Sequence, residues 1–181
     1  RKFGRFGSTL DYTWQHAQGN SSDPRETATR ADGGEDPRPR QIPLDWDQRH
    51  TLNLTLRFDE PGAFSTSGIV RVASGQPYTP ILGAGFGYGL NANSGRKPVS
   101  LLVDLRGERF VRVAGERVSL FGRVFNLFDT RTVNGFVFDS TGSADYSRFP
   151  DTTPDVNTLR DPPRYAAPRR VEIGCTVDSV W

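Results

Sequence analysis

The last stretch of the chain alternates between apolar and polar side chains. Its apolar parity holds Val171, Ile173, Cys175, Val177 and the terminal Trp181. Because successive side chains of a β-strand point to opposite faces, the pattern predicts a strand over residues 170–181 with one apolar and one polar face. A terminal aromatic residue favours a strand that crosses a bilayer, where aromatic rings lie at the membrane–water boundary. An edge strand of a soluble sandwich is the alternative for this segment.

Five further segments show the same alternation and are also predicted to be strands. They are residues 6–17, 50–58, 64–74, 99–106 and 118–127. Leucine, valine and aromatic residues occupy one parity of each segment, and threonine, serine and charged residues occupy the other. Two segments are less regular, because Ile69 interrupts the alternation of one, and Phe121 and Phe125 flank Arg123 on the polar parity of another.

The connections between these strands alternate in length. Residues 19–49, 75–98 and 129–169 form long polar loops, whereas 59–62 and 107–117 are short turns. In an up-and-down meander, all the long loops then lie at one end and the short turns at the other, as in outer-membrane barrels. We therefore expect an all-β fold, an antiparallel up-and-down meander of about six strands. It would be an incomplete segment of a large transmembrane β-barrel, because the smallest single-chain barrels have about eight strands.

Charged residues within the predicted strands fall on the polar parity. They are Asp11, Arg57, Arg71, Asp104, Arg106, Arg123, Glu172 and Asp178. A charge that faced lipid near the bilayer midplane would cost about 2–4 kcal/mol.

Composition excludes some classes of protein. The net charge is +2 with acids and bases interspersed, and without a basic stripe nucleic acid is not an expected partner. No apolar run is long enough for a transmembrane helix, which needs about twenty residues. Cys175 is the single cysteine, so we expect a small buried hydrophobic residue and no internal disulfide. The chain contains no methionine and begins at Arg1, which is typical of a fragment of a longer protein.

Four segments, in this order along the chain, carry a resemblance to a known family. They are LDWDQRHTLNL (Leu44 to Leu54), RVASGQPYTP (Arg71 to Pro80), VFNLFDTR (Val124 to Arg131) and DPPRYAAPRRVEIG (Asp161 to Gly174). Together with the terminal aromatic residue, they make the chain similar to the C-terminal part of TonB-dependent outer-membrane receptors. The receptors with a carboxypeptidase-regulatory-like N-terminal extension are the most similar type. The ordered set carries the resemblance, since no single segment is specific.

The resemblance implies a transporter in the bacterial outer membrane. Its barrel would have about twenty-two strands and would be closed by an N-terminal plug domain that this chain lacks. The implied partners are outer-membrane lipid, the plug and upstream strands of the same chain, and TonB, which would act through the absent N-terminal part. The implied solute is scarce and large: a siderophore, cobalamin, a glycan or a peptide.

In this family the last strand is also the signal for the barrel-assembly machinery. On this sequence the signal falls on Ile173, Cys175, Val177 and Trp181, and Ser179 departs from the aromatic residue often found at its position.

The long loops hold two groups of residues with candidate chemistry. Asp45, Asp47, Arg49 and His50 suggest either a metal or acid–base site, or ion pairs and hydrogen bonds at the outer rim of the second strand. We favour the rim interpretation, because these residues lack a full ligand set. We expect no catalytic residue, metal or cofactor, and no enzyme activity.

Aromatic residues in the loops are candidates for contact with a solute. GAGFGYG at 83–89 is not a dinucleotide fingerprint, because no strand–helix unit surrounds it. Rings in flexible loops can stack on sugars or planar chelates. The candidates are Tyr78, Phe86, Tyr88, Tyr146 and Phe149. The alternative is that these rings form an aromatic girdle or pack the loops together.

Two rival functions remain open from the sequence. One is a soluble β-sandwich that binds carbohydrate, in which the apolar faces would pack against a second sheet. The other is a passive porin, or a barrel enzyme, of the outer membrane.

Overall fold

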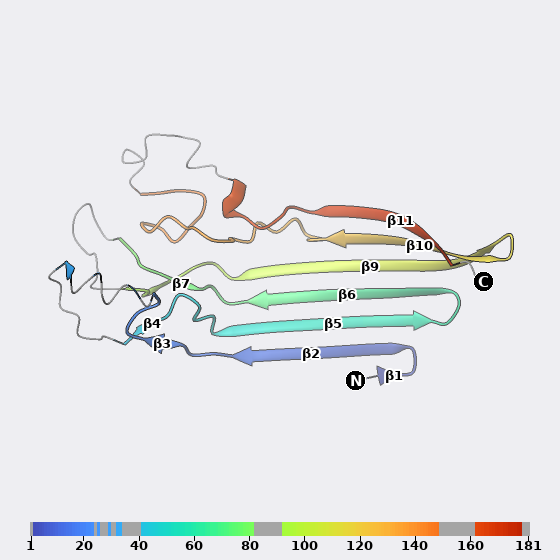
Figure 1. Ribbon diagram of the computed structural model, residues 1–181, viewed down its shortest axis with the longest axis horizontal. Coiled ribbons are helices and arrows are strands. Elements are labelled where there is room, and N and C mark those ends of the chain that lie inside the picture. The colour runs from blue at the N-terminus through green and yellow to red at the C-terminus, as the bar shows by residue number, and fades with distance from the viewer. Residues whose placement is uncertain are drawn as a thin grey trace.

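One antiparallel sheet dominates the fold. The computed structural model describes residues 2–23, 25, 29, 32–33, 41–81, 92–148 and 162–178. The sheet has the order β1-β2-β5-β6-β9-β10-β11, so neighbouring strands follow one another along the chain as an up-and-down meander (Figure 1). The strands are β1 (Lys2–Phe3), β2 (Phe6–Trp14), β5 (His50–Glu60), β6 (Phe64–Ala73), β9 (Ser100–Val113), β10 (Glu116–Phe125) and β11 (Arg170–Asp178). The predicted all-β meander of six long strands is confirmed, with the two-residue β1 added.

The remaining elements are short and lie in the long connections. They are β3 (Gln18–Gly19) paired with β4 (Ile42–Pro43), β7 (Pro77–Tyr78) paired with β8 (Gly95–Arg96), and the 3-10 helix η2 (Pro162–Arg164). Within the described ranges, no helix is long and apolar enough to cross a membrane.

The predicted turn at 107–117 is wrong, because most of these residues belong to the hairpin of β9 and β10. β9 continues through Gly107, which pairs with Gly122, and ends only at Val113. The turn is the two residues Ala114 and Gly115, whose φ angles of 53° and 93° are the left-handed values that a type I′ hairpin turn requires. A glycine followed by two charged residues predicts a turn from local composition, but here Gly107 and the residues after it pair with β10 and extend the strand.

Three other strand ends also differ from the prediction. β2 ends at Trp14 because the Ala17 N–H donates to the Asp47 side chain instead of to a neighbouring strand. β10 ends at Phe125 because Asn126 has a φ of 50°, which breaks the extended backbone. β5 extends to Glu60, where the next residues turn into β6.

The pairing registers place the apolar parities of all six long strands on one face. Directly paired residues of antiparallel strands lie on the same face of a sheet. One row across the sheet is Leu10, Leu54, Val70 and Val103, and another is Leu56, Gly68, Leu105, Val124 and Val171. The parities that were assigned strand by strand therefore form a single surface, the apolar face.

The opposite side of the sheet is the polar face. One of its rows consists of Arg57, Ser67, Arg106, Arg123 and Glu172, so the predicted parity of these charges is confirmed. Ile69 lies on the polar face between Thr55 and Asp104, which explains why it interrupted the alternation. Arg109 is the exception within β9, because it lies on the apolar face opposite Phe64.

The two ends of the sheet are unequal. The long connections 15–49, 74–99 and 126–169 leave the sheet at one end, and the turns at 61–63 and 114–115 lie at the other (Figure 1). The end with the long connections is the loop rim, and the opposite end is the turn rim. The predicted asymmetry is confirmed.

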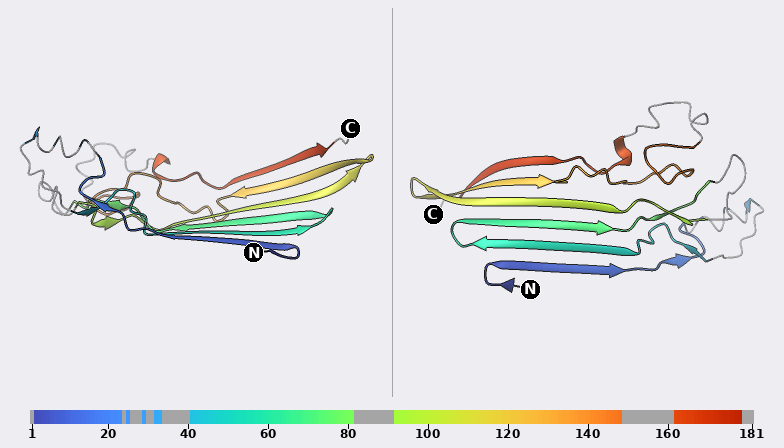
Figure 2. Two further views of the ribbon diagram at one scale, coloured as in Figure 1. Left: turned by 60° about the horizontal axis from the view of Figure 1, so that its bottom comes forward. Right: turned by 180° about the vertical axis from the view of Figure 1, so that it is seen from behind.

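The sheet is a single layer. Figure 2 shows it from its side as a thin, twisted ribbon of strands with the loops gathered at one end. Among the described residues, the buried apolar side chains are those of Pro77 and Ala144, and both lie in the long connections. A soluble sandwich needs a second sheet on its apolar face, and the described part of the chain supplies none there.

Arginine and aromatic side chains pack together on the polar face of β9 to β11. Arg106 and Arg123 lie over the Phe121 ring, with their guanidinium carbons 5.5 Å and 4.9 Å from its centroid. Arg106 also pairs with Glu108 at 3.0 Å, and Glu108 accepts a hydrogen bond from Ser119. The Phe121 ring covers Gly174, where a Cβ atom would lie 2.5 Å from it.

Replacing Gly174 with alanine should therefore destabilise the sheet. The new methyl group would displace the Phe121 ring and the two arginines stacked on it, at a cost of about 1–3 kcal/mol for overpacking. Urea unfolding of the protein would measure the change. Gly122→Ala is the matched control, because a Cβ there meets only the Glu172 carbonyl oxygen at 4.0 Å. Equal effects of the two substitutions would contradict the packing described here.

Candidate functional site

The apolar face is exposed along most of its extent. Large side chains on every long strand are open, including Leu10 at 63%, Leu105 at 43% and Ile173 at 87% relative exposure. Soluble monomers rarely expose a contiguous apolar patch larger than a few hundred Å², and larger patches mark contact with protein or membrane. This face therefore needs a partner that is itself apolar.

Aromatic side chains lie near both ends of the apolar face. Tyr12 and Trp14 are at the loop rim, where the Tyr12 hydroxyl is 2.8 Å from His50 Nδ1. Phe6, Phe58 and Phe64 are at the turn rim, where the rings of Phe58 and Phe64 stack at 5.7 Å. Trp14 is eight residues from Phe6, which is about 26 Å along a strand. Aliphatic residues occupy the space between, so β2 carries aromatic rings near both of its ends, and β5 and β6 carry them at the turn rim.

Asp47 is the centre of the loop rim. Its side chain is fully buried, with 0% relative exposure, and accepts a hydrogen bond of 2.8 Å from the Ala17 N–H. It also forms an ion pair with Arg96 and a longer one of 3.5 Å with Arg49. Since Arg96 belongs to β8, this carboxylate joins the first long connection to the second. The rim interpretation of Asp47 and Arg49 is confirmed, and no group of three potential metal-ligating side chains comes together in the described residues.

The surroundings of Asp47 determine its protonation. Burial by itself would raise the pKa of the carboxyl group, because it disfavours the charged form. The hydrogen bond from Arg96, the Ala17 N–H, the Arg96 charge and the hydrogen bond from Arg49 outweigh burial and hold the pKa below its ordinary value. Asp47 is thus a carboxylate at neutral pH, matched by the arginines around it.

Asn93 makes a second link between the first two long connections. Its side chain is nearly buried, and Nδ2 donates to the Pro43 carbonyl oxygen at 2.8 Å and to Asp45 Oδ1 at 2.7 Å. Its backbone N–H donates to Thr79 Oγ1 at 3.0 Å. The φ of 55° at Asn93 is one that asparagine tolerates better than most residues. Asp45 is therefore an acceptor within the loop rim.

Hydrogen bonds and close contacts join the second connection to the third, and also join the two ends of the second connection to each other. Lys97 Nζ donates to the Gly135 carbonyl oxygen at 2.7 Å, and the Ile81 N–H donates to the Asp139 carbonyl oxygen at 3.1 Å. The Tyr78 ring lies against Gly142, where a Cβ atom would overlap it. Gly75 lies so close to the Lys97 backbone that no side chain fits there, which gives a physical reason for glycine in the segment Arg71 to Pro80.

Asn126 fixes the start of the third connection. It is buried, and Nδ2 donates to the carbonyl oxygens of Thr130 at 3.1 Å and Ala167 at 3.2 Å. Its own N–H donates to Asp104 Oδ1 at 2.9 Å, while Asp104 Oδ2 accepts from Arg71 Nη1 at 2.9 Å. Asp104 therefore connects β6, β9 and the beginning of the loop, and Asn126 holds both ends of that loop together.

Two of the five candidate solute-contact aromatics lie within the described residues. Tyr78 packs against Gly95 and Gly142, whereas Tyr146 is 59% exposed at the loop rim. Phe86, Tyr88 and Phe149 lie outside the described residues. Sequence reasoning missed Trp46, Phe128 and Phe136, which are exposed in the long connections. They stand outside any alternating segment, so no periodic signal distinguished them.

The predicted barrel-assembly residues lie at the edge of the sheet. Ile173, Cys175 and Val177 share the apolar face of β11, and all three are exposed. Cys175 is thus not the buried residue that the sequence predicted, because nothing in the described residues covers that face. Trp181 lies outside the described residues.

Comparison with known proteins gives no relative. No family model matches the chain, and neither the curated proteins nor the solved structures contain a match. Any function must therefore be argued from the residues of this chain.

Replacing Asp47 with asparagine should loosen the loop rim. The amide cannot neutralise Arg96, and the loss of hydrogen bonds to a charged partner costs about 1.5–3 kcal/mol. Faster hydrogen exchange at residues 15–17, 44–49 and 92–97 would report it. Asp45→Asn is the matched control, because Asp45 is exposed and accepts one side-chain hydrogen bond, from the neutral amide of Asn93. Equal exchange in the two variants would contradict the central role of Asp47.

The loop rim should also lose stability in acid. The folded-state pKa of Asp47 lies below its ordinary value of 3.8, so the unfolded form binds the proton more tightly. The stabilisation is complete above pH 3.8 and is lost as the pH falls through the lower, folded pKa. Limited proteolysis of the loops across this range should show the change in the natural sequence. A comparable change in Asp47→Asn would assign the acid sensitivity to another group.

Proposed function

We propose that this chain forms six strands of the wall of a TonB-dependent transporter in the bacterial outer membrane. The carrying observation is the continuous apolar face, exposed in a single layer, with aromatic residues near both ends of β2 and at the turn rim of β5 and β6. The transporter would take up a scarce large solute without chemical conversion.

The apolar face supports contact with lipid. An aliphatic band between two aromatic borders is the outer surface that transmembrane barrels present, with a height of about 25 Å. In the strands, charged side chains lie mainly on the opposite face, where Arg106, Arg123 and Glu172 would line the interior. Of the charged residues on the apolar face, Arg109, Glu60 and Glu116 belong to the turn rim or lie beyond it.

The unequal rims support an orientation. Outer-membrane barrels have short periplasmic turns and longer outer loops. The loop rim would therefore face outward, and β11 would run from the outer side toward the periplasm. The exposed loop residues Trp46, Phe128, Phe136 and Tyr146 would be available to a solute there.

The resemblance supports active transport in particular. The segment Val124 to Arg131 contains Asn126 and the segment Arg71 to Pro80 contains Gly75, and each has a defined place in the loop rim. The plug, TonB and the barrel-assembly machinery enter the proposal through the resemblance alone.

A soluble carbohydrate-binding sandwich is disfavoured, because it would need a cover for the apolar face.

Fluorescent labels on adjacent residues test the membrane wall. Leu54 and Thr55 are neighbours on β5 whose side chains lie on opposite faces. Each is replaced by cysteine in a Cys175→Ser background of the full gene product, labelled with an environment-sensitive dye and placed in vesicles of brominated phosphatidylcholine. We expect strong quenching at position 54 and weak quenching at position 55. Weak quenching at both positions, or a protein that stays monomeric in buffer without detergent, would reject the wall.

The full gene product separates active from passive transport. A plug domain upstream of Arg1 is expected, and solute uptake should stop when the energy supply of the inner membrane is dissipated. Uptake that continues unchanged, or a gene product without a plug, would favour the porin.

A further inference from the structure

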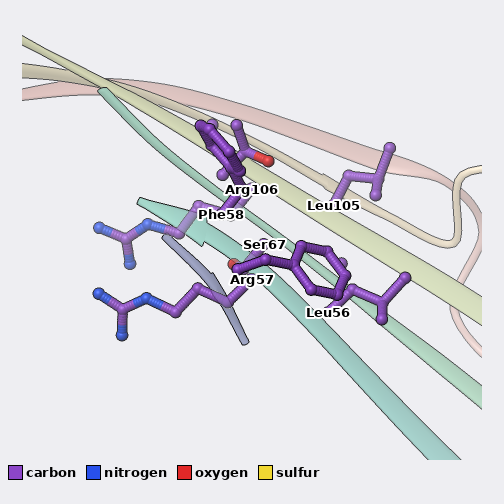
Figure 3. Close-up of a pocket in the computed structure, with 10 residues that line it drawn as sticks. Leu56, Arg57, Phe58, Ser67, Leu105 and Arg106 are labelled. Atoms are coloured by element: carbon purple, nitrogen blue, oxygen red, sulfur yellow. The ribbon is translucent and has the colours of Figure 1, made fainter. Parts of the chain in front are cut away.

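The apolar face is hollowed near the turn rim. The open hollow has a volume of about 440 Å³ and is lined mainly by apolar-face residues. Thr66, Gly68 and Gly107 have small side chains or none, while Phe6, Leu56, Phe58 and Leu105 surround them. Figure 3 shows Leu56 and Leu105 on one side, with the guanidinium groups of Arg57 and Arg106 pointing to the other. The hollow is therefore apolar, since both arginines turn their charge away from it.

Arg109 is a cation on the apolar face just beyond this hollow, and Arg5, beside Phe6, lies near the same end but forms an ion pair with Glu60. Arg109 follows Gly107 by two residues on β9, about 7 Å along the strand, and lies opposite Phe64 and Leu120. Its side chain is exposed and makes no ion pair with the described residues. Arginine at such a boundary can lay its methylene groups on apolar surface and keep its charge in the polar layer.

The level of Arg109 is set by the neighbouring strands. Phe64, its partner on β6, is the first residue after the β5–β6 turn. In a membrane wall, this level is the boundary between the acyl chains and the headgroups of the leaflet at the turn rim. A fixed positive charge at that boundary attracts anionic lipid headgroups.

We propose that the hollow and Arg109 together form a binding site for one anionic phospholipid. The lipid phosphate pairs with Arg109, and one acyl chain lies in the hollow over Gly107 and Gly68. The site belongs to the leaflet at the turn rim, and it rests on the proposed membrane wall. It extends that proposal from a general lipid contact to selection of a headgroup at a defined place.

Cys175 offers a natural probe of the site. It lies on the apolar face in the same row as Arg109 and Leu120, two strands or about 10 Å away. A dye on Cys175 of the full gene product is placed in phosphatidylcholine vesicles that contain a small share of brominated lipid. Brominated phosphatidylglycerol is compared with brominated phosphatidylcholine at the same share. We expect phosphatidylglycerol to quench with about five-fold higher apparent affinity.

Two substitutions test separately the contribution of the Arg109 charge and that of the hollow to lipid binding. Arg109→Gln should reduce the five-fold preference to about one, whereas Arg112→Gln should keep it. Arg112 is the matched control, because it lies three residues away on the polar face and is also exposed without an ion pair in the described part of the chain. Gly107→Leu places a side chain in the hollow, and its Cβ would have no atom within 4 Å. It should weaken quenching by the anionic lipid while Arg109 remains in place.

The outcomes distinguish this site from the membrane wall. Equal quenching by the two lipids in the natural sequence would overturn the site, whether or not any variant folds. If quenching at position 54 remained strong in that case, the wall would stand without a selective site. A preference lost equally in Arg112→Gln would indicate general attraction to the turn rim and also overturn the site. If Gly107→Leu leaves the preference for phosphatidylglycerol unchanged, the hollow does not bind the lipid, and the site as proposed is overturned.

Discussion

The alternation of side chains along six strands, kept in register across five pairings, is the constraint on which this molecule depends. A shift of one residue in any pairing would move the apolar residues of that strand to the opposite face. Because every register is consistent, Leu10 on β2 and Val171 on β11 belong to the same surface. That surface has no cover within the described residues, so burial in the ordinary sense does not stabilise the sheet. Its stability in the proposed setting comes from an apolar solvent around it and from backbone hydrogen bonds between strands.

The loop rim is organised in a different way. A few buried polar side chains, Asp47, Asn93 and Asn126, hold connections that are far apart in sequence. Each of them satisfies several backbone or side-chain groups at once, which is the condition under which a buried polar group stabilises a structure. The polar face combines apolar packing with interactions of charged side chains, since Phe121 packs over Gly174 while Arg106 and Arg123 stack on the Phe121 ring. The molecule thus uses apolar contact on one side and paired charges on the other.

The fold could be predicted from the sequence to the extent that it follows from alternation. The strands that contain Leu54 and Ile173 and the apolar face of each could be predicted, because a period of two specifies them. The placement of the loops could also be predicted, because it follows from their lengths. The β9 extension was missed because Gly107 and Glu108 resemble a turn when the pairing partner Gly122 is unknown. Arg109 was missed for the same reason. The links of Asp47 to Arg96 and of Asn126 to Ala167 join residues 49 and 41 positions apart, and no local pattern encodes such distances.

Asp104 links the sheet to the third long connection through two hydrogen bonds. One of its oxygens accepts a hydrogen bond from Arg71 on the polar face near the loop rim, and the other accepts one from the backbone N–H of Asn126, where the third connection begins. Asp104 therefore couples the first residues of that connection to the polar face, alongside the backbone hydrogen bond from the Leu127 N–H to the Val103 carbonyl oxygen. In a transporter, a displacement of that loop would reach the interior surface through these bonds.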